Sequence, residues 1–419
     1  MRMTLWDETK SVPVSREMVW LAYKKVKANG GSSGVDQLSM DMFDLERSPQ
    51  LYKLWNRLAS GSYFPPPVKE VEIPKKDGKV RQLGIPTIAD RVAQEVVKAY
   101  LEPRFEKIFH VNSYGYRPGK SAHQALATVR ENCKMYDWVI DLDIKGFFDN
   151  IDHQKLLLAL KKHVPEKWCL MYLERWLNAP VLNKKGELIL KQGKGTPQGG
   201  VVSPLLANLF LHYAFDVWLT GLSNTVRFVR YADDAIVHCK SQRQAQWIMA
   251  RLEERMQSCG LELHPEKTKI VYCRDYRRKE NYRTVKFDFL GYSFQPRTCK
   301  SKKDGKLFLG YDCAISTSSK KRIADKMEEL NIIGLTHKSI VGVAQFLNPF
   351  IRGWINYYGK FRKGEMNPVF HLLSKRLVRW ARKRYKRYKT NPRRAWLWFN
   401  RVREQFPGLF YHWQVGITG

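Results

Sequence analysis

The sequence predicts a mixed α/β protein of the α+β type, in which antiparallel strands alternate with helices. Residues 63–90 and 226–239 each carry strand-type sequence on both sides of a tight turn, which is typical of a β-hairpin. Apolar residues recur at helical spacing in residues 90–105 and 243–258, directly after each hairpin. From about residue 301, charged and aromatic residues alternate on helical stretches, so we expect a helical region to follow.

The charge balance predicts a polyanionic partner. The 419-residue chain carries 73 Lys and Arg against 40 Asp and Glu, a net charge of +33. Aromatic residues make up 13% of the chain and provide surface on which bases can stack. The length allows two or three domains, and 44% hydrophobic residues is typical of a globular protein.

An anionic membrane surface is the other partner that a basic chain could bind. No apolar run is expected to approach the roughly 20 residues that span a bilayer, and the N-terminus does not resemble a signal peptide. The seven cysteines are scattered and none forms a C-x-x-C pair. They are typical of reduced thiols in a cytoplasmic protein and predict no zinc site. The expected lack of a spanning run and of a signal peptide predicts no membrane partner.

The segment Val226–Cys239, VRFVRYADDAIVHC, places two neighbouring aspartates between apolar strand-type runs. Successive side chains of a strand point to opposite faces, so Asp233 and Asp234 can converge only if the chain turns at the pair. Two carboxylates there would repel each other unless a cation neutralised them, and Mg²⁺ prefers oxygen ligands of this kind. The alternative is a solvated Asp-Asp turn, which is the commoner situation for an isolated pair.

A third carboxylate comes from Trp138–Phe148, WVIDLDIKGFF. At strand spacing Asp141 and Asp143 share one face, while apolar residues on the opposite face can pack on helices. Together with the two aspartates of the hairpin, this stretch would complete a site for two divalent ions about 3.5–4 Å apart, as two-metal phosphoryl transfer requires. Asp143 lies nearer the end of the strand and is the favoured ligand, whereas Asp141 is a candidate for a supporting role.

The hairpin of residues 63–90 carries Lys75 and Arg81 on either side of its Asp-Gly turn. A hairpin brings such a pair close together, and an arginine fork beside a lysine point charge suits a triphosphate. An ordinary solvated basic hairpin explains these residues equally well.

Two Gly- and Pro-containing loops are candidate contacts to nucleotides or nucleic acid. Residues 112–121 carry Arg117 and Lys120 ahead of a helix N-terminus, which favours phosphate, although the glycine spacing is not that of a P-loop. The second loop precedes a buried helix that is expected to begin near Ser203. It presents Gln198, whose amide could bond a nucleotide sugar or a template base.

The C-terminal region is strongly basic, with no acidic residue between Glu365 and Glu404. Leucines and aromatic residues are interleaved with the cations, which predicts a folded basic helix with an apolar stripe. We expect one helix over residues 375–389 that binds nucleic acid. Its candidate contact residues are Lys375, Arg376, Arg379, Arg382, Lys383, Arg384, Lys386 and Arg387.

Taken in order, these motifs resemble those of the reverse transcriptase/maturase proteins encoded by bacterial group II introns. The resemblance covers nearly the whole chain. It rests on the segments IPKKDGKVRQLGIPT, SYGYRPGKSAH, VIDLDIKGFFDNIDH, GTPQGGVVSPLLANL, RYADDAIV, LHPEKTK, FDFLGYSF, GWINYY and LFYHWQVG.

The resemblance implies a right-hand polymerase fold. Fingers and palm, with an antiparallel palm sheet, would occupy residues 1–300, an α-helical thumb (the maturase X region) residues 301–372, and a basic nucleic-acid-binding segment residues 373–419. By the same resemblance, two Mg²⁺ ions, or Mn²⁺, would be held by three aspartates, and four further residues would contact the incoming nucleotide. The metal ligands would be Asp143, Asp233 and Asp234; Lys75 and Arg81 would clamp the triphosphate, Gln198 would contact the nucleotide, and Phe148 would block a ribose 2′-hydroxyl.

The implied activity is RNA-directed DNA synthesis from a primer 3′ end, combined with maturase binding of the intron RNA for splicing and retrohoming. Expected partners are group II intron RNA, an RNA template with a DNA or RNA primer, target DNA and dNTPs, in the bacterial cytoplasm at the nucleoid. Many relatives carry a C-terminal endonuclease with paired cysteines. A chain that ends at Gly419 is expected to lack it, so that a free DNA 3′ end would prime synthesis.

Two other functions are compatible with the residues. One is an RNA-binding splicing cofactor whose polymerase activity is secondary. The other is a domesticated relative that acts in phage defence or DNA repair. The clustered aspartates favour the polymerase over a purely binding protein, because negative charge in a cleft would weaken a grip on RNA.

Overall fold

The chain is described here by a computed structural model. The side chains of Pro74 and Arg81 lie outside the description. The residues described are 11–74, 80–197, 199–301 and 303–417.

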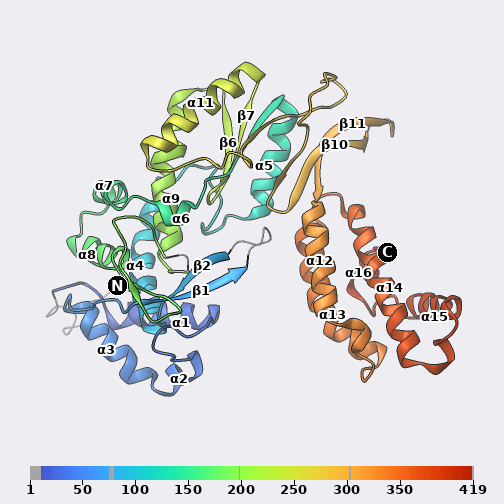
Figure 1. The fold of residues 1–419 in the computed structure, drawn as a ribbon, viewed down its shortest axis with the longest axis horizontal. Helices are drawn as coiled ribbons and strands as arrows, with labels where there is room; N and C mark the ends of the chain where they lie inside the picture. The colour runs from blue at the N-terminus through green and yellow to red at the C-terminus, as the bar shows by residue number, and fades with distance from the viewer. Residues whose placement is uncertain (1–10, 75–79, 198, 302, 418–419) are drawn as a thin grey trace. The chain divides into compact units, whose positions relative to one another are not determined.

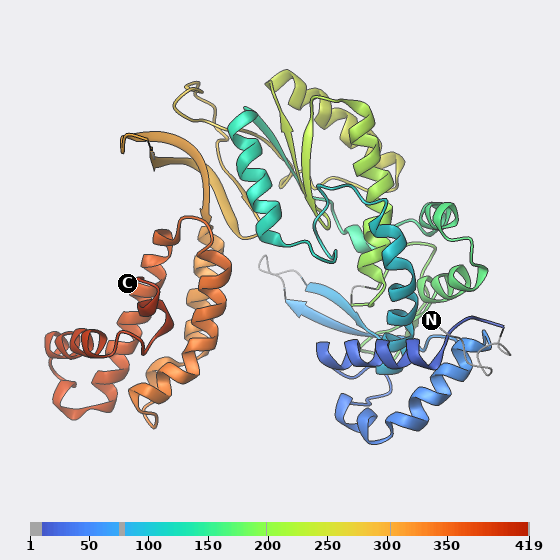
Figure 2. The same cartoon turned by 180° about the vertical axis from the view of Figure 1, so that it is seen from behind.

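The chain forms two compact units, each with its own core. The first comprises Met1–Ser121 and Ile140–Lys269, and the second comprises Ala122–Val139 and Ile270–Gly419. Figures 1 and 2 show both units from opposite sides, coloured along the chain. The domain boundaries at residues 300 and 372 stay a prediction.

Most of the first unit is helical, with strands inserted between the helices (Figure 1). Its first helix begins where the predicted N-cap, Ser15, accepts a hydrogen bond from the backbone N–H of Met18 at 3.2 Å. The elements are α1 (Arg16–Asn29), α2 (Met40–Leu45), α3 (Arg47–Ala59), β1 (Val68–Pro74), β2 (Val80–Ile85), α4 (Ile88–Glu106), β3 (Trp138–Leu142), α6 (Phe147–Asn150), α7 (His153–His163), α8 (Lys167–Leu177), β4 (Val181–Leu182), β5 (Leu188–Ile189), α9 (Ser203–Leu211), a π-helical turn η1 (His212–Asp216), α10 (Val217–Leu222), β6 (Arg227–Tyr231), β7 (Asp234–Cys239), α11 (Gln242–Ser258) and β8 (Lys269–Tyr272). The unit boundaries cut β3 and β8, whose residues 138–139 and 270–272 are assigned to the second unit.

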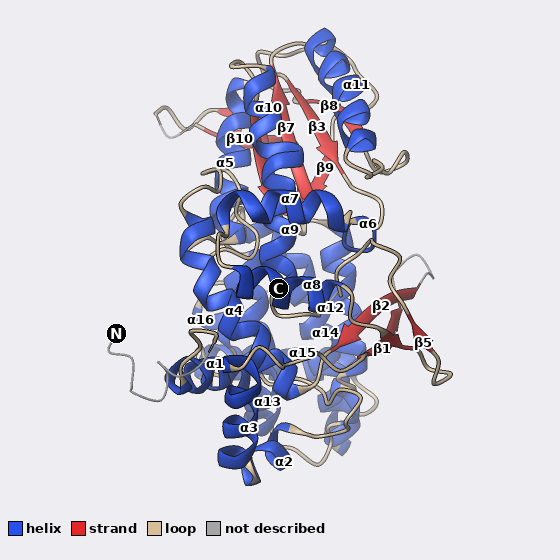
Figure 3. Ribbon diagram, turned by 90° about the vertical axis from the view of Figure 1, so that its left-hand side faces the viewer, coloured by secondary structure: helices blue, strands red, loops and turns tan. Residues whose placement is uncertain are grey.

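Both predicted hairpins form. Strands β1 and β2 pair antiparallel from Lys69 with Ile85 to Pro74 with Val80, and they belong to a sheet of order β2-β1-β4-β5. Strands β6 and β7 pair antiparallel (Figure 1) in a second sheet of order β6-β7-β3-β8, of which Figure 3 labels β7, β3 and β8. The middle strands β7 and β3 are mostly apolar and buried, apart from the aspartates Asp234 and Asp141, and α11 packs against β7. The sheet is therefore a rigid support for what its strand ends carry.

One expectation about apolar runs is wrong. The stretch Ser203–Leu222 is 20 residues long, with a mean hydropathy of 1.3, and is long and apolar enough to cross a membrane. The π-helical turn joins α9 and α10 into one continuous helix, which is why the run is longer than expected. Two-thirds of the apolar window is buried inside the protein, as in a core helix.

The second unit combines one helix, a three-stranded sheet and a helical bundle. The sheet has the order β11-β10-β9, and β10 and β11 form a long hairpin that pairs from Tyr292 with Ile315 to Lys300 with Leu307. Its elements are α5 (Ala122–Met135), β9 (Phe287–Phe289), β10 (Tyr292–Lys300), β11 (Leu307–Ile315), α12 (Thr317–Glu329), η2 (Ile332–Gly334), α13 (Ile340–Tyr358), η3 (Lys363–Met366), α14 (Asn367–Arg384), η4 (Lys386–Tyr388), α15 (Pro392–Gln405) and α16 (Tyr411–Gln414).

The basic helix predicted over residues 375–389 begins earlier than expected, at Asn367, and also ends earlier. Helix α14 ends at Arg384, and the next residues form the separate turn η4. The helix stops because Tyr385 leaves helical geometry and packs its ring edge-on against Trp380 and Trp398, at 5.9 and 5.6 Å between ring centroids. This packing buries Trp380 completely and outweighs the helix propensity of the basic run.

Candidate active site

The two aspartates lie at the tip of the β6–β7 hairpin, as predicted. Tyr231 pairs with Asp234, so the loop consists of Ala232 and Asp233 alone. Ala232 has φ = 57°, in the left-handed region that two-residue hairpin loops require and that alanine rarely adopts. Such backbone strain persists only where the surroundings hold the chain in place, and it is concentrated at functional sites.

The loop of residues 112–115 is one of those surroundings. The backbone N–H of Tyr114 donates to the carbonyl of Arg230 at 2.8 Å, and the N–H of Arg230 donates to the carbonyl of Asn112 at 2.9 Å. Gly115 then passes so close to the hairpin that a Cβ on it would lie 2.3 Å from the backbone nitrogen of Ala232. A glycine is therefore required at this position, which accounts for the Tyr-Gly-Tyr sequence of the loop.

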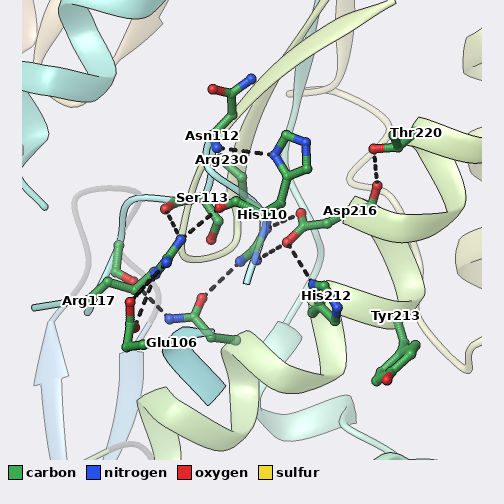
Figure 4. Close-up of polar contacts among 12 residues, drawn as sticks. Glu106, His110, Asn112, Ser113, Arg117, His212, Tyr213, Asp216, Thr220 and Arg230 are labelled. Atoms are coloured by element: carbon green, nitrogen blue, oxygen red, sulfur yellow. Dashed lines mark hydrogen bonds and ion pairs between the residues drawn. The ribbon is translucent and has the colours of Figure 1, made fainter. Parts of the chain in front are cut away.

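A buried ion pair supports the hairpin from behind (Figure 4). Arg230 is 1% exposed and donates to both carboxylate oxygens of Asp216, from Nε at 2.7 Å and from Nη2 at 2.6 Å. Its Nη1 donates to Asn208 Oδ1 at 2.9 Å and to the carbonyl oxygen of Ala232 at 3.0 Å. The guanidinium thus fixes the strained loop residue from the interior.

Asp143 follows directly on β3, the strand beside β7 in the sheet order. Its carbonyl oxygen accepts a hydrogen bond from the backbone N–H of His264 at 2.8 Å. Its carboxylate Oδ2 lies 3.2 Å from the ammonium of Lys267. Asp141 lies 3.6 Å from Lys269, an ion pair consistent with the supporting role considered for it.

The raised pKa of Asp234 indicates electrostatic repulsion among the three carboxylates. The pKa of Asp234 is raised to about 7 by loss of hydration, by the charge of Asp233 and by the charge of Asp143, while Lys267 lowers it. Asp234 is nevertheless an exposed residue. The repulsion between carboxylates is therefore the better supported cause, since water reaches the side chain and limits the loss of hydration.

The donor chemistry of this site suits a hard divalent cation. Three carboxylates whose repulsion is offset only in part by Lys267 supply the oxygen ligands that Mg²⁺ or Mn²⁺ prefers. Within the described residues, no three Asp, Glu, His or Cys side chains are grouped closely enough to hold a metal ion as they stand. The residues fit the ion in chemistry and charge, and Lys267 occupies part of the coordination space of Asp143.

The predicted nucleotide contacts are only partly described. Phe148 lies in α6, is 8% exposed, and packs edge-on against Phe147 at 5.4 Å. Its carbonyl oxygen accepts a hydrogen bond from the N–H of Thr196 at 2.8 Å, which ties the Gly- and Pro-containing loop to α6. Lys75, Gln198 and the side chain of Arg81 lie outside the described residues.

Arg117 does not have the environment expected of a nucleic-acid contact. Its side chain is 5% exposed, forms an ion pair with Glu106 at 2.9 Å, and donates to the carbonyl oxygens of His110 and Ser113 at 2.7 Å (Figure 4). This geometry favours a role in shaping the loop, and contact with nucleic acid stays a prediction. Lys120 is half-buried; its ammonium donates to the carbonyl oxygen of Val111 at 3.1 Å and lies 5.0 Å from the centre of the Tyr114 ring.

The basic residues near the C-terminus divide into two sets. Arg376, Arg382 and Arg384 are partly buried and bond to Glu328, to the carbonyl of Lys389 and to the carbonyl of Thr336, respectively. The others are exposed to solvent and are free to approach phosphate. They are Lys375, Arg379, Lys383, Lys386 and Arg387.

Sequence reasoning missed the residues that position the hairpin. Asp216, Asn208 and Arg230 support it from a π-helical turn, a buried helix and a strand, and only the unusual polar residues in an apolar run marked the first two. Interacting carboxylates at the ends of neighbouring strands are typical of metal-dependent phosphoryl transfer. A net charge of +33 indicates a nucleic-acid substrate. Together they indicate an enzyme that transfers nucleotidyl groups on nucleic acid.

Comparison with known proteins specifies the family. Residues 73–294 match the reverse transcriptase (RNA-dependent DNA polymerase) family, and residues 320–398 match the group II intron, maturase-specific domain. The chain therefore belongs to the reverse transcriptase family and carries a maturase-specific domain. This membership confirms the predicted polymerase fold, the predicted enzyme class and the resemblance to group II intron proteins, and it implies dependence on divalent metal ions.

Individual relatives agree with this assignment. The group II intron-encoded protein LtrA of Lactococcus lactis subsp. cremoris is 28% identical over 82% of this chain and 69% of its own length. Protein YkfC of Escherichia coli (strain K12) is 31% identical over 58% of this chain and 73% of its own. An uncharacterized 91 kDa protein in the cob intron of Schizosaccharomyces pombe is 28% identical over 83% of this chain, which spans half the length of that relative.

Proposed function

We propose that this protein is an RNA-directed DNA polymerase that extends a primer 3′ end with deoxynucleotides on an RNA template. Asp143, Asp233 and Asp234 are its catalytic residues and the ligands of two Mg²⁺ ions. The observation that carries the proposal is the position of these carboxylates at the ends of neighbouring strands, where loss of hydration and the charges of Asp233 and Asp143 raise the pKa of Asp234 to about 7. A cluster of this kind is stable in its ionised form only with added positive charge.

The chemistry divides between the ions and the protein. Bound divalent ions would stabilise the attacking 3′-hydroxyl and the departing pyrophosphate. The hairpin fixes Asp233 and Asp234 through the strained Ala232, and β3 presents Asp143. Lys267 neutralises part of the negative charge of Asp143 before metal ions bind. Lys267 must then move away so that the Asp143 carboxylate can coordinate a metal ion.

The nucleotide contacts follow from the family resemblance. Phe148, next to the site in sequence and nine-tenths buried, would exclude a ribose 2′-hydroxyl. Lys75 and Arg81 would bind the triphosphate, and Gln198 would contact the nucleotide. These four assignments complete the proposed dNTP site.

The second part of the function is that of a maturase. The match of residues 320–398 to a maturase-specific domain and the name of LtrA support binding of a group II intron RNA. The exposed residues Lys375, Arg379 and Lys383 on α14 would bind its phosphates, and target DNA would bind the same basic segment. Splicing and retrohoming of the intron are the reactions this binding would assist.

Primer extension on an RNA template tests the polymerase. Asp233→Ala should abolish incorporation of dNTPs, because one ligand and one negative charge are lost from the site. Asp41→Ala is the matched control, since Asp41 is an exposed aspartate in the first turn of α2. Synthesis by purified Asp233→Ala protein at the wild-type rate would contradict the proposal.

A splicing assay separates the two parts of the function. The Asp233→Ala protein should still promote splicing of the cognate intron RNA, while a triple Lys375→Ala, Arg379→Ala, Lys383→Ala protein should not. If the triple variant splices normally, these residues do not bind the intron RNA.

A further inference from the structure

The second unit contains a cavity of about 530 Å³ that none of the functions above uses. It is lined by α5, by residues 275–278, by the β10–β11 hairpin and by Arg362. Its volume falls within the range of roughly 300–1,000 Å³ that is typical of ligand sites. All of its lining residues belong to the second unit, whereas the three carboxylates belong to the first.

The lining is strongly cationic. Its two carboxylates are already bound, Asp275 by Arg278 at 2.5 Å and Asp312 by Arg130 at 2.6 Å. Lys300, at the end of β10, forms no ion pair with a carboxylate within the part of the chain that the structure describes. The cavity therefore offers excess positive charge to an anion. Its basic residues are Arg130, Lys134, Arg277, Arg278, Lys300 and Arg362.

Two aromatic rings open into solvent at the same cavity. Tyr276 is 54% exposed and Phe308 is 38% exposed, and their rings meet edge-on at 5.6 Å between centroids. The backbone N–H of Tyr276 donates to the carbonyl of Leu309 at 2.8 Å, which fixes the ring beside β11. The guanidinium of Arg277 lies 5.6 Å from the centre of the Tyr276 ring. Exposed aromatic faces beside a polar cavity mark a binding site.

The floor of the cavity is kept open by a glycine. A Cβ on Gly310 would lie 2.8 Å from the sulfur of Cys299 and 3.4 Å from the ring of Phe308. Any larger residue would push the aromatic ring or the thiol into the open space. The cavity is thus built from rigid elements and fits a flat ring together with an anionic group.

We propose that this cavity binds a single unpaired nucleotide of an RNA strand, with its base stacked on Tyr276 and its phosphate bound by Lys300. Stacking on aromatic side chains is how proteins hold unpaired bases, and lysine neutralises the phosphate. An acidic peptide would pair with the cations but would leave both rings exposed. The inference takes RNA as the partner from the proposed function and adds the structural form in which the RNA is recognised.

Binding of two RNA hairpins by the full chain tests the inference. One hairpin carries a single-nucleotide bulge and the other is fully paired, and both are titrated by fluorescence anisotropy at one fixed salt concentration. The wild type should bind the bulged hairpin about tenfold more tightly, at the lower end of the effect of base stacking. Tyr276→Ala should lose this preference and Tyr276→Phe should keep it, because only the ring face is needed. Tyr52→Ala is the matched control, because Tyr52 is equally exposed.

A second variant tests the phosphate contact. Lys300→Ala should weaken binding of the bulged hairpin and reduce its slope of log K against log salt by about 1, as expected for one lost phosphate contact, and should leave binding of the fully paired hairpin unchanged. Lys306 is a matched control, because its side chain is 83% exposed and does not line the cavity; Lys306→Ala should change neither the binding nor the slope. An unchanged slope for Lys300→Ala would remove this residue from the site.

Two outcomes would overturn the inference: equal binding of the two hairpins by the wild type, or full preference retained in Tyr276→Ala. Crosslinking of a bulged 5-iodouridine to Tyr276 or Phe308 would locate the base directly. Asp233→Ala should keep the preference for the bulged hairpin, and Tyr276→Ala should keep primer extension on an unstructured template. Failure of the proposed nucleotide site in the cavity is therefore distinguishable from failure of the proposed polymerase.

Discussion

Replacing Arg230 by Met removes the cation of the buried pair with Asp216 while keeping most of the volume of the side chain. The carboxylate that remains is inaccessible to solvent and has lost two hydrogen bonds, of 2.7 and 2.6 Å. Removing one partner of a buried pair costs about 3–5 kcal/mol. We expect the free energy of unfolding to fall by that amount, measured by urea denaturation followed by circular dichroism.

A double variant, Arg230→Met with Asp216→Leu, separates stability from positioning. Replacing both partners by apolar groups removes the unpaired buried charge, so most of the lost stability should return. Primer extension should not recover, because the carbonyl of Ala232 no longer receives its hydrogen bond of 3.0 Å and the strained loop relaxes. We expect kcat to fall by at least tenfold with little change in KM for dNTP.

The control for both variants is Arg227→Met, an exposed arginine in the same strand, which should be close to wild type. If the double variant is stable and retains the wild-type kcat, Arg230 serves stability alone and the argument for positioning fails. If Arg230→Met is as stable as the wild type, the buried pair of Arg230 and Asp216 does not stabilise the fold by the expected amount of about 3–5 kcal/mol.

Three other variants probe separate parts of the fold. Gly115→Ala places a methyl group 2.3 Å from the nitrogen of Ala232, so it should destabilise the hairpin by about 1–3 kcal/mol and slow primer extension. Gly221 has open space around it, so Gly221→Ala is the control and should have neither effect. Equal urea midpoints for the two variants would contradict the close approach of Gly115 to the hairpin. Burial lowers the pKa of His412 to about 3, against about 6.5 in the unfolded chain. Between these two values the unfolded state binds one more proton than the folded state. The free energy of unfolding therefore decreases as the pH is lowered from 6.5, by up to about 1.4 kcal/mol per pH unit. His412→Phe should flatten this slope between pH 7 and 5, and an unchanged slope would assign the pH dependence elsewhere. Phe148→Ala should raise incorporation of ribonucleotides in primer extension, and unchanged discrimination would remove Phe148 from the sugar site.

The catalytic hairpin could be predicted from sequence because its information is local. Apolar runs on both sides of Asp233–Asp234 determine the strands, and convergence of the two side chains requires a turn between them. The approach of Asp143 to Lys267 could not be predicted, since it depends on the backbone contact between residue 143 and residue 264. Asp216 reaches Arg230 only because a π-helical turn redirects the chain, and no periodic pattern records such a turn.

The C-terminal helix shows the opposite case, in which local sequence misleads. The run of cations and aromatics after Leu377 continues a helical pattern, yet the backbone departs at Tyr385. What decides its course is the contact of that ring with Trp398, in a helix that follows in sequence. Tertiary contacts of this kind override helix propensity, whose differences are below about 1 kcal/mol per residue for all but proline.

Strand β6 lies at the end of its sheet order, and its outer side is occupied near the tip by the loop of residues 112–114. An open outer strand offers unpaired backbone groups to strands of other molecules and invites aggregation. By pairing with Arg230 along this border, the loop shields the outermost strand where the two aspartates are presented. The same few residues therefore leave fewer unpaired backbone groups at the outer edge of the catalytic sheet.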